Sequence, residues 1–311
     1  MAEERYSFNR KLKLLSFSLM ILGLMGLSFG FVTAPKNIQE AREIMSHQDH
    51  GENHSDNSKI QKDKIDINSL SIMYKSKKEE AEHGASHDEH VFHQLSNKPW
   101  AALYVAAFFF FMISLGTLAF YAINRAAQVG WSPILFRVME GITAYMLPGG
   151  LIVIFILFLS GLHLNHLFIW MDPEVVAHDK IISAKKGYLN VPFVLARGLF
   201  FLAGWSLYRY FSRKFSLAQD LAKDNKYHKK NFRISAGFLV FYIVTESIMS
   251  WDWIMSIDPH WFSTLFGWYV FASMFVSGIS TIALVTIYLK SKGYLKAVSY
   301  THLTLPTKRI V

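Results

Sequence analysis

The sequence predicts an all-α integral membrane protein with six spanning helices, and three observations lead to this fold class. Of the 311 residues, 52% are hydrophobic and 26 are Phe, which is typical of a multi-span membrane protein. Six apolar runs each reach roughly 20 residues, which at ~1.5 Å per residue crosses a ~30 Å hydrocarbon core. Outside residues 35–98 the basic residues gather in short loops beside these runs, so the net charge of +9 reflects membrane orientation and not nucleic-acid binding.

The apolar runs divide the chain into segments. Residues 1–34 are expected to form a cytoplasmic N-terminus and a first span at about 14–32. This run resembles a signal peptide, with Val32-Thr33-Ala34 as a cleavage site, but its length favours a spanning helix. Residues 99–256 are expected to form a four-helix bundle, and residues 257–296 a hairpin and a sixth helix. The predicted limits of these five spans are 99–123, 134–162, 191–212, 234–256 and 263–289.

Residues 35–98 form a polar segment that carries seven of the 13 His. His83, His87, His90 and His93 follow one another at spacings of 4, 3 and 3, which places them on one face of a helix. Imidazoles on one face can bind zinc or copper, but no Cys or carboxylate set completes the site. The simpler interpretation is a solvated loop that lies on partner subunits.

The distribution of basic residues predicts the orientation. Seven Lys and Arg lie within residues 213–233, whereas the hairpin at 257–262 has none. The positive-inside rule then places the N-terminus in the cytoplasm and residues 35–98, 163–190 and 257–262 outside. Three Lys within residues 163–190 oppose this weakly.

One aromatic stretch, residues 246–269, joins the last two spans and holds four of the eight Trp. Trp collects where a membrane meets water, and carboxylates near a span often mark a pathway or pocket. The sequence predicts that this stretch and the end of the third span converge on an outer-side pocket for a quinol and its protons. Capped helix ends are the alternative. The pocket candidates are His163, His166, Asp172, Trp251, Asp252, Trp253, Asp258 and His260.

A second polar set lies deeper in the predicted spans. Arg137 and Glu140 are three residues apart and can form an ion pair, and Arg197 can pair with Glu246 or Asp252. Buried ion pairs explain these charges, and the alternative is a proton relay that runs from Glu140 through Tyr145 to Glu246 and Asp252. Pro148-Gly149-Gly150 is expected to break or kink the helix beside that path.

The sequence predicts that this chain binds no redox cofactor. It has no Cys, which excludes cysteine-held iron–sulfur clusters and covalently attached haem c. No His lies in the middle of a predicted span, where a membrane haem needs its axial ligands. Any electron transfer would therefore run through metals in partner subunits.

The strings SWDWIMSIDPHWFSTLFGWYVFASMFVSG and PWAALYVAAFFFF resemble the F subunits of bacterial alternative complex III, a quinol:electron-acceptor oxidoreductase. Those subunits are similar to the membrane anchor of polysulfide reductase, the NrfD-like family. The resemblance implies about ten spanning helices in two four-helix bundles, of which this chain holds the first bundle and the start of the second. It also implies an inner-membrane complex with a sister membrane subunit, an iron–sulfur subunit and c-haem subunits.

The resemblance does not by itself make this chain catalytic. It implies quinol oxidation in the sister subunit and a structural or proton-conducting role here. A transporter or channel, and a non-catalytic membrane anchor, are the alternatives. Residues 297–311, with VSYTHLTLPTKRIV at their end, resemble a translated sequencing adapter, and the natural protein is expected to continue beyond about Lys296.

Overall fold

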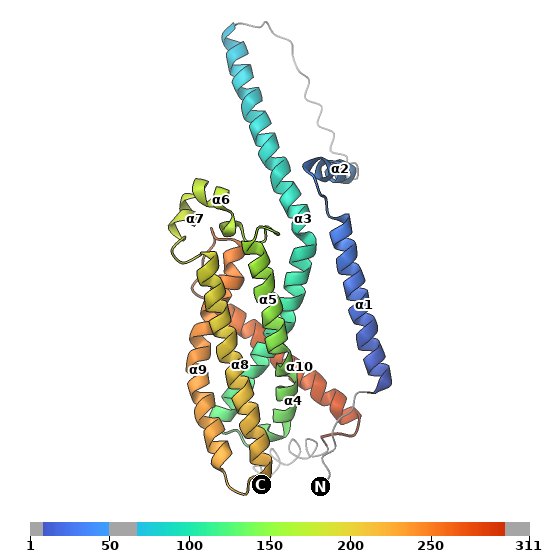
Figure 1. The fold of residues 1–311 in the computed structure, drawn as a ribbon, viewed down its shortest axis with the longest axis vertical. Coiled ribbons are helices and arrows are strands. Elements are labelled where there is room, and N and C mark those ends of the chain that lie inside the picture. The colour runs from blue at the N-terminus through green and yellow to red at the C-terminus, as the bar shows by residue number, and fades with distance from the viewer. Residues whose placement is uncertain (1–8, 50–66, 296–311) are drawn as a thin grey trace, which may run out of the picture. The chain divides into compact units, whose positions relative to one another are not determined.

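The computed structural model describes residues 9–49 and 67–295, and for residues 45–49 and 67–91 it describes the backbone alone. Within these residues all regular structure is helical, and six helices are long and apolar enough to cross a membrane (Figure 1). The predicted fold class is therefore confirmed. The chain divides into a unit of residues 11–103 and a unit that contains residues 104–295, and each is considered by itself. The expected adapter-derived residues, 297–311, lie outside the described residues.

The unit of residues 11–103 is built from α1 (Arg10–Thr33), α2 (Ile38–Asp49) and the first part of α3 (Ile67–Ala126). Helix α1 matches the span expected at 14–32. Near its end, the Phe31 ring meets Trp100 edge to face, with the centroids 4.9 Å apart. Helix α3 begins 32 residues before the expected start at 99 and continues through Pro99. The Lys, Glu and Ala of residues 75–85 favour a helix intrinsically, which a reading based on polarity alone overlooks.

The second unit holds the predicted four-helix bundle and the sixth span. Its bundle consists of α3 from Tyr104 onward, α4 (Phe136–Ile142) with α5 (Met146–Gly161), α8 (Val191–Leu221) and α9 (Lys226–Trp253). Helices α8 and α9 lie side by side and antiparallel, joined by residues 222–225 (Figure 1). Both extend beyond the predicted spans at the end that carries residues 222–225, because polar residues continue each helix past the apolar run there.

An aromatic core fills the bundle. The side chains of Phe111, Trp205 and Trp253 are fully buried, and their ring centroids lie 5.8–6.4 Å apart. Gly198 makes room for this cluster, since the Trp253 ring comes to 3.0 Å from the position that a Cβ would take there. Trp205 donates its indole N–H to Thr245 Oγ1 at 3.0 Å. Large rings from three helices therefore hold α3, α8 and α9 together.

Helix α10 (Phe266–Ser291) crosses α3 where two glycines remove the side chains. A Cβ on Gly116 would lie 2.2 Å from the Met274 carbonyl oxygen, and a Cβ on Gly278 would lie 2.8 Å from the Thr117 nitrogen. The two backbones therefore touch, in the manner of close helix crossings in membranes.

The helix interruption lies before the predicted Pro148-Gly149-Gly150. Helix α4 ends at Ile142, a 3₁₀ turn covers Thr143–Tyr145, and α5 then begins at Met146. Pro148 thus sits in the first turn of α5, where a missing N–H costs nothing. Gly150 instead serves packing, because a Cβ there would meet the Leu202 side chain at 2.5 Å.

Candidate functional site

The polar residues of the bundle gather at its two ends. The loop end carries residues 162–190 and 258–265, and the basic end carries the turns at 127–131 and 222–225. Glu246 lies inside the bundle between these two layers, on α9.

At the loop end, Arg197 of α8 and Asp252 of α9 form a two-point ion pair. Arg197 Nε lies 2.8 Å from Asp252 Oδ2, and Arg197 Nη2 lies 2.9 Å from Oδ1. Asp252 is completely buried and Arg197 is 12% exposed. The sequence predicted either Glu246 or Asp252 as the ion-pair partner of Arg197, and in the structure the partner is Asp252.

Two aromatic rings and a carbonyl complete the environment of Arg197. The guanidinium carbon lies 4.1 Å from the Tyr188 ring centroid and 4.2 Å from that of Phe193. Its nitrogens also donate to the Tyr188 carbonyl at 3.3 and 3.4 Å. Because Asp252 is buried and Arg197 is largely shielded and bonded to further groups, the pair holds α8, α9 and the end of the 162–190 loop together.

The end of α9 is tied to α3 beside this pair. Tyr104 donates its hydroxyl to the Trp253 carbonyl at 2.6 Å, and Ser256 donates to the Asp252 carbonyl at 2.5 Å. Trp253, expected in an outer pocket, belongs instead to the aromatic core. Trp251 is half-buried, and its indole N–H has no hydrogen-bond partner among the described residues.

Glu246 differs from the buried Asp252 and Glu140 because no ion pair joins it to a cation among the described residues. It is 3% exposed, and its Oε1 has no hydrogen-bond partner in the described part of the chain. It lies six residues before Asp252, or ~9 Å along the helix axis. Nearby on α9, the Tyr242 hydroxyl is turned to Met274 Sδ at 3.4 Å. An ionised carboxylate in this position is costly.

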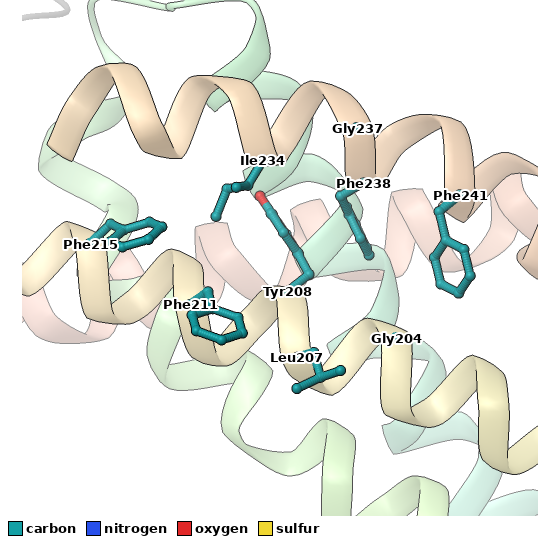
Figure 2. A pocket seen from close by; sticks show the side chains of 9 residues that line it. All are labelled: Gly204, Leu207, Tyr208, Phe211, Phe215, Ile234, Gly237, Phe238 and Phe241. Carbon is teal, nitrogen blue, oxygen red and sulfur yellow. The ribbon is translucent and has the colours of Figure 1, made fainter. Parts of the chain in front are cut away.

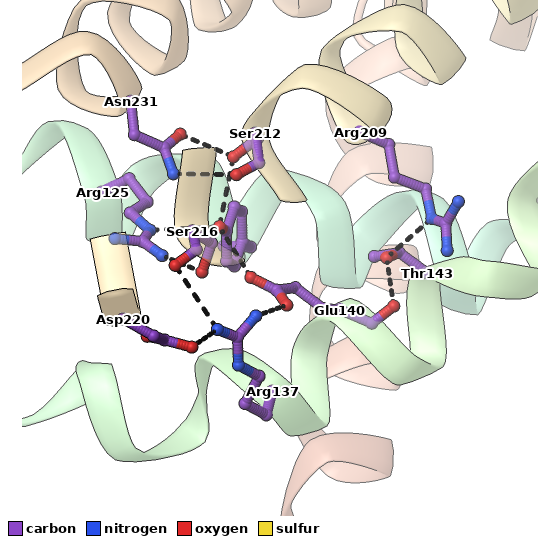
Figure 3. A network of polar contacts seen from close by, with 10 residues as sticks. Arg125, Arg137, Glu140, Thr143, Arg209, Ser212, Ser216, Asp220 and Asn231 are labelled. Carbon is purple, nitrogen blue, oxygen red and sulfur yellow. Dashed lines mark hydrogen bonds and ion pairs between the residues drawn. The ribbon is translucent and has the colours of Figure 1, made fainter. Parts of the chain in front are cut away.

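The basic end holds a network of polar side chains from several helices (Figure 3). Its hydrogen bonds converge on the hydroxyl of Tyr121. The Tyr121 hydroxyl donates to Glu140 Oε1 at 3.2 Å, and it accepts from Arg125 Nε and Ser212 Oγ at 3.1 Å each. Ser212 in turn contacts Asn231 Oδ1 at 2.6 Å. The Tyr121 hydroxyl therefore connects α3, α4 and α8, and Ser212 extends the network to α9.

Arg125 and Arg137 belong to this network, and Arg137 forms the ion pair with Glu140. The predicted pair is present, since Arg137 Nη1 lies 2.6 Å from Glu140 Oε2. Arg137 also contacts Asp220 at the end of α8. Arg125 donates to Ser216 Oγ at 2.9 Å, and its guanidinium carbon lies 3.7 Å from the centre of the Phe136 ring.

Sequence reasoning missed most of this network. It found Arg137 and Glu140 but not the residues that join them to other helices, which are Tyr121, Arg125, Ser212, Ser216, Asp220 and Asn231. The available signal was the pair Tyr121 and Arg125, four residues apart at the end of an apolar run.

Tyr145 was expected in a relay, but its side chain is 36% exposed and meets Phe110. No hydrogen bond found in the described residues links Tyr145 to Glu140 or Glu246.

The remaining pocket candidates lie in the loops of the loop end. His260 Nε2 lies 2.5 Å from Asp179 Oδ2, and its backbone N–H donates to Asp258 at 3.2 Å. Lys185 Nζ donates to the Pro259 carbonyl at 2.5 Å. The hairpin at 257–262 is therefore held to the 162–190 loop by the His260–Asp179 pair and by Lys185, which also lies 5.9 Å from the Phe262 ring centroid.

Two aspartates in this loop act as helix caps. Asp172 accepts from the Glu174 N–H at 2.9 Å and begins α6 (Pro173–His178). Asp179 accepts from the N–H groups of Ile181 and Ile182 and begins α7 (Lys180–Ala184). The Ile182 N–H, with His260 and the Ile181 N–H, holds the pKa of the Asp179 carboxyl below its usual value. For Asp172 the capping alternative agrees with the geometry.

Two further pocket candidates are the histidines that follow α5. His163 is exposed and has φ 59°, and its N–H donates to the Ser160 carbonyl at 3.0 Å, so it ends the helix. His166 is half-buried.

A cavity of about 350 Å³ does occur at the loop end, but none of the eight predicted pocket residues lines it. Its walls come from residues 170–191, including Trp170, Met171, Lys186 and Asn190.

Metal binding by the His-rich segment stays a prediction. The backbone of α3 is helical from 83 to 93, as the His spacing assumes, but the side chains of His83, His87 and His90 lie outside those described. Among the described side chains, no three His, Cys, Asp or Glu gather in a metal-binding group.

Comparison with known proteins assigns no family. No protein-family model matches the chain, and no curated protein matches it.

Proposed function

We propose that this membrane-embedded chain is a subunit of a respiratory quinol:cytochrome c oxidoreductase of the alternative complex III kind, or of one with another acceptor. In this proposal the chain contributes to assembly and to proton conduction, and electrons pass through partner subunits. The partners are a sister NrfD-like membrane subunit, an iron–sulfur subunit and c-haem subunits. Quinol is the substrate of the complex, and the sequence resemblance supplies these identities.

The observation that carries the proton-conducting role is Glu246. It is a buried carboxylate whose Oε1 has no hydrogen-bond partner among the described residues, and it shares its helix with Asp252 of the Arg197–Asp252 pair. Carboxylates that serve only structure are paired, as Asp252 and Glu140 are. A carboxylate inside apolar helices without a cation is suited to accept and release a proton.

The proposed orientation follows the basic residues. The basic end faces the cytoplasm and the loop end faces the periplasm, where quinol-derived protons would leave. A reporter fused at residue 70 should then read as periplasmic, and one inserted in the turn at 222–225 as cytoplasmic. The reverse pattern would overturn the orientation and the assignment of the loop end as the exit side.

The test of the proton role is Glu246→Gln in the assembled complex, with exposed Glu174→Gln as the matched control. The expected result is normal assembly with a fall in quinol turnover or in protons released per quinol. Asp252→Asn should disturb assembly first, because it weakens a buried pair. Unchanged turnover and proton release in assembled Glu246→Gln would leave only the anchoring role.

A transporter or channel is the second candidate, and one observation favours it. The span Ser132–Gly161 is interrupted by a 3₁₀ turn at Thr143–Tyr145, and transporters use discontinuous helices to form sites. Solute or ion flux through the purified chain in vesicles, without quinol or redox partners, would support this candidate against the first.

A further inference from the structure

An apolar groove of about 470 Å³ runs between α8 and α9 (Figure 2). The side chains that line it come from both helices and are almost all aliphatic or aromatic: Leu207, Phe211, Phe215, Ile234, Phe238 and Phe241. The only side-chain hydroxyl in its wall is that of Tyr208, which is bonded to Ser235 Oγ at 2.8 Å. The wall therefore offers a ligand apolar surface and no free hydrogen-bonding group.

Two glycines explain why a groove remains open between α8 and α9. A Cβ on Gly237 would have nothing within 4 Å, so the space beside it is open. On α8, a Cβ on Gly204 would lie 2.5 Å from the Phe241 ring, so this ring sits directly against the α8 backbone. Deeper in the interface, Phe238 stacks on Tyr208 with ring centroids 3.8 Å apart, which closes the floor.

The groove has a positively charged rim at the basic end. Lys230 is exposed, and its Nζ lies 5.7 Å from the ring centroid of Phe215, the lining residue nearest the turn, and 5.8 Å from that of Tyr227. Residues 222–233 add Lys223, Lys226, Lys229 and Arg233, against one acidic residue, Asp224. Asp220 does not neutralise this rim, since it contacts Arg137.

We propose that this groove binds an anionic phospholipid, with an acyl chain along the aromatic wall and the phosphate beside Lys230. The apolar part of the groove lies inside the bilayer and suits an acyl chain. The cations lie where the groove reaches the headgroups and suit a phosphate. A quinone tail would satisfy the apolar part of the groove alone, because a quinone head carries no negative charge for Lys230. A zwitterionic lipid would fill the groove but gain less from the rim.

The experiment measures lipid binding to the purified protein by native mass spectrometry, with dioleoylphosphatidylglycerol and dioleoylphosphatidylcholine as probes. We expect the wild type to prefer phosphatidylglycerol. Lys230→Gln should lower that affinity about fivefold and lower the affinity for phosphatidylcholine less, because one juxtamembrane cation is removed. Gly237→Leu fills the groove and should weaken both lipids.

Matched controls separate the site from general effects. Lys290→Gln removes an exposed cation on α10 at the same end of the bundle, and Gly141→Leu adds the same side chain where a Cβ meets nothing within 4 Å. Both should bind lipid as the wild type does. Since Lys230 is exposed, its variant keeps the proposal testable if Gly237→Leu fails to assemble.

Equal wild-type affinity for the two lipids would overturn the proposal, as would a Lys230→Gln variant with an unchanged preference. Displacement of phosphatidylglycerol by a long-tailed quinone, with binding insensitive to Lys230→Gln, would assign the groove to a quinone tail instead. None of these outcomes depends on quinol oxidation, so the lipid site and the proposed function stand or fall separately.

Discussion

Arg197 and Asp252 are 55 residues apart in the sequence and form a two-point ion pair with N–O distances of 2.8 and 2.9 Å. Removal of one partner leaves an uncompensated charge in a buried position. We expect Arg197→Leu to lower the stability of the detergent-solubilised protein by about 3–5 kcal/mol. The measurement is thermal unfolding.

The double variant Arg197→Leu/Asp252→Leu is the control for this pair. It removes both charges, so it should be more stable than Arg197→Leu alone. If the double variant were instead the less stable of the two, the destabilisation would come from lost packing and not from the stranded Asp252.

The stability of the bundle should also depend on the Tyr121 hydroxyl. Tyr121→Phe removes three hydrogen bonds at once and leaves polar groups of Arg125 and Glu140 less satisfied. We expect a loss of about 1–3 kcal/mol in unfolding free energy. Tyr210→Phe, on the exposed face of α8, should change little, and equal effects of the two variants would refute the role of Tyr121 as the centre of the network.

The crossing of α3 and α10 gives a third prediction. Gly116→Ala places a methyl group against the Met274 carbonyl, so the helices must separate, at a cost of about 1–3 kcal/mol. Gly141→Ala adds the same methyl group in open space on α4 and should be neutral or stabilising. The two unfolding temperatures, measured side by side, decide this prediction.

The loop end should respond to acid. The folded-state pKa of Asp179 is lowered, so its stabilisation is fully present above its unfolded pKa, about 3.9. It is lost as pH falls through the lower folded pKa. Hydrogen-exchange protection of the Ile181 and Ile182 amides should therefore decline below about pH 4.

Variants at this contact separate its two parts. Asp179→Asn should remove most of the pH dependence, whereas His260→Gln should keep the part that comes from the capping N–H groups. A decline in protection that survives Asp179→Asn would assign the pH response to another group.

The sequence predicted the six helices because hydropathy and span length are properties of each segment alone. It also found Arg137 with Glu140, which are three residues apart on one helix. It could not choose between Asp252 and Glu246 for Arg197, since that choice depends on the rotation of α8 against α9. The polarity of residues 67–98 predicts a loop, but their Lys, Glu and Ala favour a helix, and α3 continues through Pro99.

The candidate site was harder to predict than the fold. Eight residues were expected to converge on one pocket because they fall near the same membrane surface. The structure distributes them among an ion pair, an aromatic core, helix caps and a loop contact. Depth in a membrane can be estimated from a sequence, but the direction of a side chain depends on neighbouring helices.

The central claim is that this chain belongs to a quinol-oxidising respiratory complex. The most direct measurement is purification of the tagged chain from its native membrane, followed by haem spectroscopy and a quinol oxidation assay. We predict that c-haem and iron–sulfur proteins copurify in fixed ratio and that quinol reduces the bound haem. Recovery of the intact chain without redox partners and without quinol-dependent haem reduction would contradict the claim.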